Sequence, residues 1–280
     1  MSVPSTGSPA PIGAGGVGGT PILAARDVHR TIGDVEILAG VDLEIAPREV
    51  VAIVGPSGSG KSTLLELVCG LQIPDRGTLT VPSAALMPQR DLLLPWLNAR
   101  DNVALPLRIA GVAKVEARER ADALLRRVSL DAFGSYRPDQ LSGGMRQRVS
   151  FLRALATDRP LLCLDEPFGA LDAITREELQ SWLGDLLDDR PRSVLLVTHD
   201  VEEAVMLSDR VVVFSPRPAR VTATVVVGSP RPDLEAAPGA VPAAARPHRD
   251  PTDPLIVAAR AEVRDALHRA MASAPSEGVR

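Results

Sequence analysis

Aromatic residues make up only 2% of this 280-residue sequence, and the first 95 residues contain no Phe, Tyr or Trp. Because 45% of the residues are hydrophobic, Leu, Val, Ala and Ile must fill a sizeable core. Lysine is scarce as well, since Lys61 and Lys114 are the two lysines among 31 basic residues. The formal net charge of −4 supplies no basic surface for nucleic acid. The composition therefore favours a globular protein that does not bind nucleic acid, and the position of each lysine is informative.

Long apolar runs are missing too. No run approaches the roughly 18 residues that a membrane span needs, and the N-terminus lacks the basic start and apolar stretch of a secretory signal. The sequence predicts a cytoplasmic protein that reaches a membrane only through a partner. Two cysteines, Cys69 and Cys163, stand in apolar runs and are predicted to be buried thiols in a reducing compartment.

The composition changes along the chain and suggests four regions. Residues 1–20 are rich in Gly, Pro and Ser and are predicted to be a disordered tail. Residues 21–228 form the predicted main domain, and a Pro/Ala-rich linker follows over 229–253. Residues 254–280 are predicted to hold a terminal helix over Leu255–Met271, with apolar residues at helical spacing, and a short tail.

Apolar patterns within the main domain predict an α/β fold. Period-2 patches predict short antiparallel strands over Val28–Ile32, Val35–Leu38 and Val41–Ile45. Continuous apolar runs predict buried parallel strands over Val50–Val54, Leu161–Leu164, Val194–Val197 and Val211–Phe214. Because helical patterns separate these runs, we expect a parallel sheet covered on both faces. Residues from about 95 to 150, including a charged pattern over Lys114–Val128, predict a helical insert.

A glycine-rich segment directly follows the first predicted parallel strand. Gly55 to Ser62 fits the pattern GxxxxGK followed by Ser or Thr, and an apolar run that suits a helix comes next. Glycines let successive backbone N–H groups point at phosphate oxygens, and the helix N-terminus adds its positive end. Lys61 would place its charge on the β- and γ-phosphates, and the Ser62 hydroxyl would bind Mg²⁺. The segment predicts a phosphate-binding loop.

Two other predicted strands end in polar side chains. Asp165 and Glu166 follow the second strand, and His199 follows the third. Ligands bind at the carboxyl edge of such sheets, so we expect Asp165 to hold Mg²⁺ and Glu166 to polarise the attacking water. His199 would face the γ-phosphate. In isolation, two acids in a turn are structural about as often as they are functional, and a single histidine is more often structural.

Residues 141–148 read LSGGMRQR, in which Ser142, Gly143 and Gly144 place a hydroxyl and two glycine amides at a helix start. Such a start is a second anion site. This segment precedes the predicted strand that ends in Asp165 and Glu166, and the residues Ala-Leu-Asp follow at 170–172. With these motifs, the sequence from about residue 21 to residue 225 resembles the ABC ATPase family. The resemblance implies the P-loop NTPase fold of that family, with a parallel-sheet core, a small antiparallel subdomain and a helical insert.

The resemblance also implies cofactors, site residues and partners. It implies MgATP bound between two copies of the chain arranged head to tail. Residues 141–148, the signature segment of the family, would face the phosphate loop of the other copy. Gln89 would contact Mg²⁺ and link to the insert, and Asp172 would lie at the dimer seam. The implied catalytic residues are Lys61, Glu166 and His199, and the metal ligands are Ser62, Gln89 and Asp165. The nucleotide-binding residues would be Gly55, Pro56, Ser57, Gly58, Ser59, Gly60, Lys61, Ser62, Thr63, Gln89, Ser142, Gly143 and Gly144.

Weaker features resemble the ATPases of importers for nitrate, sulfonate, taurine and pyrimidine precursors. These features are residues 89–96, 102–103 and 217–221. They imply a peripheral protein on the inner face of the membrane, with a separate permease as partner and an extracytoplasmic substrate-binding protein contacted indirectly. Trp96 is predicted to anchor the permease, the alternative being that it packs within the insert. Ile32 stands where the family has an aromatic ring against adenine, and Arg30 is predicted to lie over the base.

Two other classes stay open at this point. The chain could be a soluble ABC ATPase acting on nucleic acid or the ribosome, but such proteins usually carry long insertions, zinc sites or paired cassettes. It could also be a non-hydrolysing regulatory subunit, although Glu166 and His199 are both present.

Overall fold

The computed structural model describes residues 20–169, 171–189, 192–227 and 249–273. Its centre is a six-stranded sheet in which five strands are parallel and one edge strand is antiparallel. The strand order is β5-β6-β7-β3-β8-β9. The strands are β3 (Val50–Val54), β5 (Ala84–Met87), β6 (Leu161–Asp165), β7 (Ser193–Val197), β8 (Arg210–Phe214) and β9 (Val221–Val226). All four predicted parallel strands are present.

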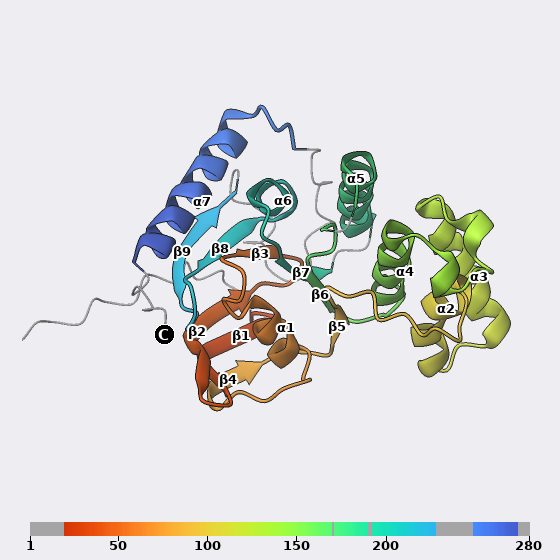
Figure 1. Ribbon diagram of the computed structural model, residues 1–280, viewed down its shortest axis with the longest axis horizontal. Helices are drawn as coiled ribbons and strands as arrows, with labels where there is room; N and C mark the ends of the chain where they lie inside the picture. Colours follow the sequence, from red (N-terminus) through yellow and green to blue (C-terminus); the bar gives the residue numbers. More distant parts are fainter. Residues whose placement is uncertain (1–19, 170, 190–191, 228–248, 274–280) are drawn as a thin grey trace, which may run out of the picture.

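Both faces of this sheet are covered, because side chains of each buried strand alternate between two separate hydrophobic clusters. In β3, Val51 and Ile53 pack with α1 (Lys61–Val68) and the N-terminal strands. On the other face, Ala52 and Val54 belong to the cluster that includes helices α4 (Gly143–Leu155), α5 (Ala173–Asp189), α6 (Val201–Leu207) and α7 (Pro254–Ala272). Figure 1 shows α6 and α7 on one side of the sheet and α1 on the other.

The antiparallel subdomain has three strands in the order β2-β1-β4. They are β1 (Leu23–Ile32), β2 (Val35–Ile45) and β4 (Arg76–Thr80). The prediction of two strands over Val35–Leu38 and Val41–Ile45 is wrong, because the chain continues through Gly40 (φ 77°) as one irregular strand. The third strand is β4, which sequence reasoning missed because it is mostly exposed and has no apolar alternation.

Residues 95–149, all described, contain helices and no strand. They hold α2 (Ala99–Ile109), α3 (Lys114–Arg127), two short 3-10 turns at Asp131–Phe133 and Pro138–Gln140, and the start of α4. The pair α2 and α3 projects from one end of the molecule, opposite α7 (Figure 1). Because α4 packs against both α2 and β5, this helix joins the insert to the sheet.

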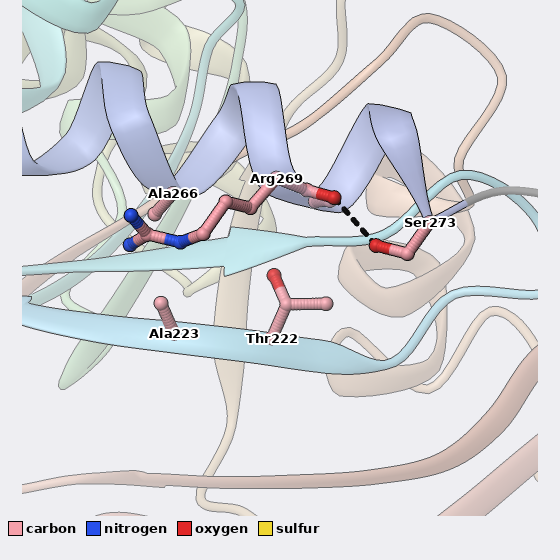
Figure 2. Close-up of a pocket in the computed structure, with 6 residues that line it drawn as sticks. Thr222, Ala223, Ala266, Arg269 and Ser273 are labelled. Carbon is pink, nitrogen blue, oxygen red and sulfur yellow. Dashed lines mark hydrogen bonds between the residues drawn. The ribbon is translucent and has the colours of Figure 1, made fainter.

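The helix predicted over Leu255–Met271 is α7, which packs on α6, β8 and β9 through Ile256, Ala259 and Val263. A pocket of about 190 Å³ lies between α7 and β9 (Figure 2). It is lined by Thr222, Ala223, Ala266, Arg269, Ala270 and Ser273, none of which is a candidate site residue. The predictions for residues 1–19, 170, 228–248 and 274–280 fall outside the described residues.

The two cysteines differ in burial. Cys163 is fully buried in β6, as predicted, but Cys69 is only partly buried, so that part of the prediction is wrong. Cys69 is the C-cap of α1 and is followed by the exposed turn at Gly70. Within the described part of the chain, no helix is long and apolar enough to cross a lipid bilayer.

Candidate active site

The glycine-rich loop connects β3 to α1 and has a backbone that favours glycine at two points. Gly58 and Gly60 have φ values of 73° and 105°, in the left-handed region. A Cβ atom on Gly60 would lie 2.8 Å from Cγ2 of Ile37 and 3.0 Å from Cδ2 of Leu38. The loop is therefore pressed against β2 at Gly60.

Lys61 is the first residue of α1, but its side chain folds back into the loop. Its ammonium group donates to the carbonyl oxygens of Gly55 at 2.9 Å and Pro56 at 2.8 Å, and lies 3.5 Å from Oγ of Ser59. Burial lowers the pKa of Lys61, while the nearby carboxylates of Glu166 and Asp165 raise it. A compact positive charge is thus held inside the loop, beside both acids.

Asp165 is the last residue of β6 and is hydrogen-bonded to the Ser62 side chain of α1. Burial raises the pKa of this carboxyl, and the neighbouring Glu166 charge adds to the effect. A buried carboxylate beside a hydroxyl, with a second carboxylate in the next residue, is a donor set that suits a hard divalent cation such as Mg²⁺. The residues present therefore fit a Mg²⁺ ion at this point.

Glu166 is the centre of the polar group at the strand ends. Its Oε2 accepts a hydrogen bond from Nε2 of Gln89 at 2.9 Å, and its Oε1 lies 3.2 Å from Nδ1 of His199. Its backbone has φ of 47°, which is uncommon for a non-glycine residue, and its N–H donates to the carbonyl of Val197 at 2.8 Å. Sparsely populated backbone conformations of this kind concentrate at functional sites. The structure thus brings together Glu166, Gln89 and His199 from β6, β5 and β7.

Ser142, Gly143 and Gly144 lie at the N-terminus of α4. The exposed Ser142 hydroxyl accepts a hydrogen bond from N of Met145 at 3.3 Å and so caps the helix. Within the described part of the chain, this serine contacts its own helix and not the Lys61–Glu166 group. The two predicted anion sites of one chain are therefore separate, and Ser142 in the second is open to solvent.

Comparison with known proteins agrees with this geometry. Residues 38–169 match the family model described as ABC transporter. The chain is 46% identical over 185 residues to the formylaminopyrimidine import ATP-binding protein ThiZ of Halalkalibacterium halodurans, covering 65% of this chain and 74% of the relative. It is 44% identical over 237 residues to the taurine import ATP-binding protein TauB of Mesorhizobium japonicum, covering 81% of this chain and 89% of the relative.

The chain belongs to the ABC transporter family and is an ATP hydrolase of that family. A solved structure agrees: the dimeric, post-hydrolysis ATP-binding cassette MJ0796 bound to ADP and Pi superposes with a TM-score of 0.68 at 30% identity. The match covers 74% of this chain and 99% of that cassette.

The loop that carries His199 in this ABC ATPase is held by residues that sequence reasoning missed. Glu203 is buried, and its Oε2 accepts a hydrogen bond from the Thr198 hydroxyl at 3.0 Å. Burial raises the pKa of Glu203 to about 8. Asp200 caps α6 by accepting from the N–H groups of Glu202 and Glu203. An aspartate followed three residues later by glutamate is a known helix-start signal, which could have revealed this support.

A second missed feature holds the segment after Gln89. Two arginines of α4 bind it: Arg146 donates to Asp91 Oδ2 at 2.9 Å, and Arg153 donates to the carbonyl oxygens of Asp91 and Leu92. Ser142 is the N-cap of α4. The hydrogen bonds of Arg146 and Arg153 therefore connect the segment after Gln89 to the helix that begins at the second predicted anion site. No local sequence pattern indicates this pairing.

Arg30, which was predicted to lie over an adenine base, is held by contacts within the antiparallel subdomain. Arg30 donates to Asp75 Oδ1 at 2.8 Å and to Gln72 Oε1 at 2.8 Å, which holds it beside the segment that leads into β4. The strand register also shifts between Arg30 and Thr31, so the assumption of a regular alternation from Arg30 to Ile32 fails. Ile32 itself is 47% exposed at the end of the β1–β2 hairpin.

Proposed function

We propose that this ABC ATPase is the subunit that energises uptake of a small solute through a separate membrane permease. The observation that carries the proposal is the Glu166 carboxylate, in contact with both Gln89 and His199 and beside the buried Lys61. The printed names of the relatives, which are import ATP-binding proteins for taurine and formylaminopyrimidine, support the direction of transport and the class of cargo. They do not favour the alternative of an ATPase acting on nucleic acid or the ribosome.

Different residues would serve different parts of the reaction ATP + H₂O → ADP + phosphate. The loop amides of Gly55–Thr63 and the Lys61 ammonium would bind the phosphates. Glu166 would accept a proton from the attacking water, and His199 would contact the γ-phosphate. Ser62, Asp165 and Gln89 would hold Mg²⁺, which when bound supplies positive charge against the phosphate oxygens. Release of phosphate from MgATP by the purified full chain tests the proposal, and absence of release would contradict it.

The exposed second anion site supports a head-to-tail homodimer. Ser142, Gly143 and Gly144 would complete the nucleotide site of the partner copy, because they do not reach the phosphate loop of their own chain. The solved relatives are described as dimeric cassettes, which supports the same arrangement. Asp172 caps α5 by accepting from N of Thr175 at 3.0 Å, and in the proposed dimer it would lie at the seam.

The permease contact would involve the segment that follows Gln89. Trp96 is 67% exposed, so it does not pack within the insert, and it stands near the exposed Leu92 in the sequence. A large exposed aromatic is a typical anchor of a protein interface. The proposed location is therefore the inner face of the membrane, where the permease would hold the subunit and an extracytoplasmic binding protein would act indirectly.

Replacing Trp96 with Ala should weaken the complex with the permease without changing the ATPase rate of the isolated subunit. Removal of an interface anchor typically costs about 2 kcal/mol or more, or roughly 30-fold in affinity. Co-purification from cells that express both proteins measures it. Ile109→Ala, at a residue that is 79% exposed on α2, is the matched control. Equal recovery of the complex from all three forms would place Trp96 outside the contact.

Replacing Ile32 with Tyr should tighten ATP binding several-fold and leave kcat almost unchanged. A ring would stack on the base, which is worth about 1–3 kcal/mol in proteins that bind single-stranded nucleic acid, and the aliphatic Ile32 already recovers part of this. Stacking is equal in the ground and transition states, so the rate should not change. Titration with a fluorescent ATP analogue measures the affinity. Ile73→Tyr, at a residue that is 79% exposed, is the control, and unchanged affinity in Ile32→Tyr would show that Ile32 is not over the base.

A further inference from the structure

His199 lies between a residue that the sheet holds and a residue that α6 holds. Its side chain is largely exposed, so the backbone on either side, and not packing of the ring, sets its position. On one side, the N–H of Thr198 donates to the carbonyl oxygen of Ile53 in β3 at 3.2 Å. On the other side, Asp200 is the N-cap of α6 and accepts from the N–H of Glu202 at 2.8 Å. A movement of α6 would therefore carry Asp200 and the histidine next to it.

The helix α6 has seven residues and depends on its neighbours for its position. Isolated helices shorter than roughly 12–15 residues are marginal in water, so tertiary contacts must hold it. It packs on β3 and β8 of the sheet and on the C-terminal helix α7 (Figure 1). Ala204 and Val205 of α6 are fully buried in the same hydrophobic cluster as Ile256, Ala259 and Val263 of α7. The C-terminal helix therefore contributes directly to where α6 lies.

Two arginines of the C-terminal segment add polar contacts at the two ends of α6. Arg249, which precedes α7, donates to the carbonyl oxygens of Val205 in the last turn and Ser208 at the C-cap. Carbonyl groups at this end of a helix have no partner within the helix itself. Arg260 of α7 donates to Oε1 of Glu202, in the first turn, at 2.5 Å. The contact between Arg260 and Glu202 is thus at the end of α6 that adjoins the candidate active site.

The surroundings of this ion pair favour a fixed geometry. The side chain of Arg260 is mostly buried and that of Glu202 is half-buried, so salt screens the pair less than a fully exposed one. The guanidinium also donates to the carbonyl oxygen of Pro251 at 3.2 Å, which holds it from a second direction. Asp200 and Glu202 place two carboxylates at the start of α6, where like charges repel each other. Arg260 offsets this repulsion and ties the first turn of α6 to α7.

We propose that Arg260 is a positioning residue for ATP hydrolysis, which acts through Glu202 and the first turn of α6 to hold His199 against Glu166. The distance of 3.2 Å between Nδ1 of His199 and Oε1 of Glu166 is the geometry that this path maintains. The consequence for the rate rests on the proposed function, in which His199 contacts the γ-phosphate. The effect of Arg260 on the position of the ring does not.

Replacing Arg260 with Ala should lower kcat about tenfold and keep the affinity for a fluorescent ATP analogue within about twofold. Misplacing a group at a reacting centre by about 1 Å can cost about 10²-fold in rate, and here Arg249 and the apolar contacts limit the displacement. Affinity should persist because none of the candidate phosphate and Mg²⁺ ligands lies on α6 or α7. Arg260→Lys should recover part of the rate. Arg264→Ala, at an exposed residue one turn further along α7, is the matched control and should keep the wild-type rate.

Two further measurements separate positioning from a general loss of stability. When Arg260→Glu and Glu202→Arg are combined, the ion pair can form in the opposite direction, so the rate should exceed that of either single variant. The chain has four histidines, and replacing each in turn assigns its ring Cε1 resonance in NMR spectra of histidine-labelled protein. Arg260→Ala should shift the resonance of His199 and leave that of His29, in β1, unchanged. Arg264→Ala should shift neither.

Other outcomes would overturn the proposal. An unchanged kcat in Arg260→Ala, or an equal fall in Arg264→Ala, would show that the contact with Glu202 does not position the active site. Loss of nucleotide affinity together with kcat, without recovery in the reversed pair, would leave Arg260 a role in stability alone. If the wild type hydrolyses no ATP, the proposed function fails, while the His199 resonance still decides whether Arg260 holds the ring. A His199 resonance that does not move in Arg260→Ala would contradict the positioning path itself.

Discussion

Replacing Glu166 with Gln should abolish ATP turnover and preserve ATP binding. The amide has the same shape as the carboxylate but cannot accept a proton from the attacking water, and a general base contributes typically 10²–10⁴-fold to a rate. The hydrogen bond from Gln89 and the close approach of His199 show that Glu166 reaches both flanking strand ends. Its backbone N–H donates to the carbonyl oxygen of Val197, and the substitution leaves this bond intact. We therefore expect the variant to fold and to bind MgATP.

Two measurements check this expectation. Phosphate release should fall by at least about 10²-fold, and ATP should trap a dimer that size-exclusion chromatography detects. Glu119→Gln provides the control, since Glu119 is an exposed glutamate on α3, away from the strand ends. Steady hydrolysis near the wild-type rate in Glu166→Gln would show that another group is the base.

The parts of this fold that could be predicted are those encoded by contiguous residues. The phosphate loop is one segment, and its glycines are needed because Gly58 and Gly60 take left-handed conformations. The buried strands β3, β6, β7 and β8 are apolar on both faces, so each forms a visible run. The ends of these strands carry Asp165, Glu166 and His199, and parallel pairing necessarily brings such ends to one edge.

The parts that could not be predicted depend on contacts between distant segments. Arg30 pairs with Asp75 and Arg146 pairs with Asp91, and neither pair leaves a trace in local periodicity. The edge strand β4 is largely exposed and has no apolar alternation that would reveal it. The partial exposure of Cys69 follows from its position at the end of α1, and an error of one turn in a helix end reverses such a prediction.

The proposed head-to-tail dimer, in which two copies share each nucleotide site, predicts a specific pattern of loss and recovery of activity. Lys61→Ala should lose nucleotide binding, because the only positive charge inside the phosphate loop is removed and the carbonyl oxygens of Gly55 and Pro56 lose their donor. Ser142→Arg should bind ATP as a monomer but fail to hydrolyse it, because a long cation at the start of α4 obstructs the γ-phosphate site of the partner copy. Both variants alone should be inactive in phosphate release.

Mixing the two inactive variants should restore part of the activity. In a mixed dimer, the Ser142→Arg chain offers an intact phosphate loop and the Lys61→Ala chain an intact signature, so one of the two sites is complete. If random pairing makes half of the dimers mixed, up to about a quarter of the wild-type rate should return. Ser142→Ala is the control, since it removes the helix cap, worth about 1 kcal/mol, without adding bulk, and it should retain far more activity than Ser142→Arg. Normal hydrolysis by Ser142→Arg alone would rule out the head-to-tail arrangement, because each chain would then complete its own site without a partner's signature.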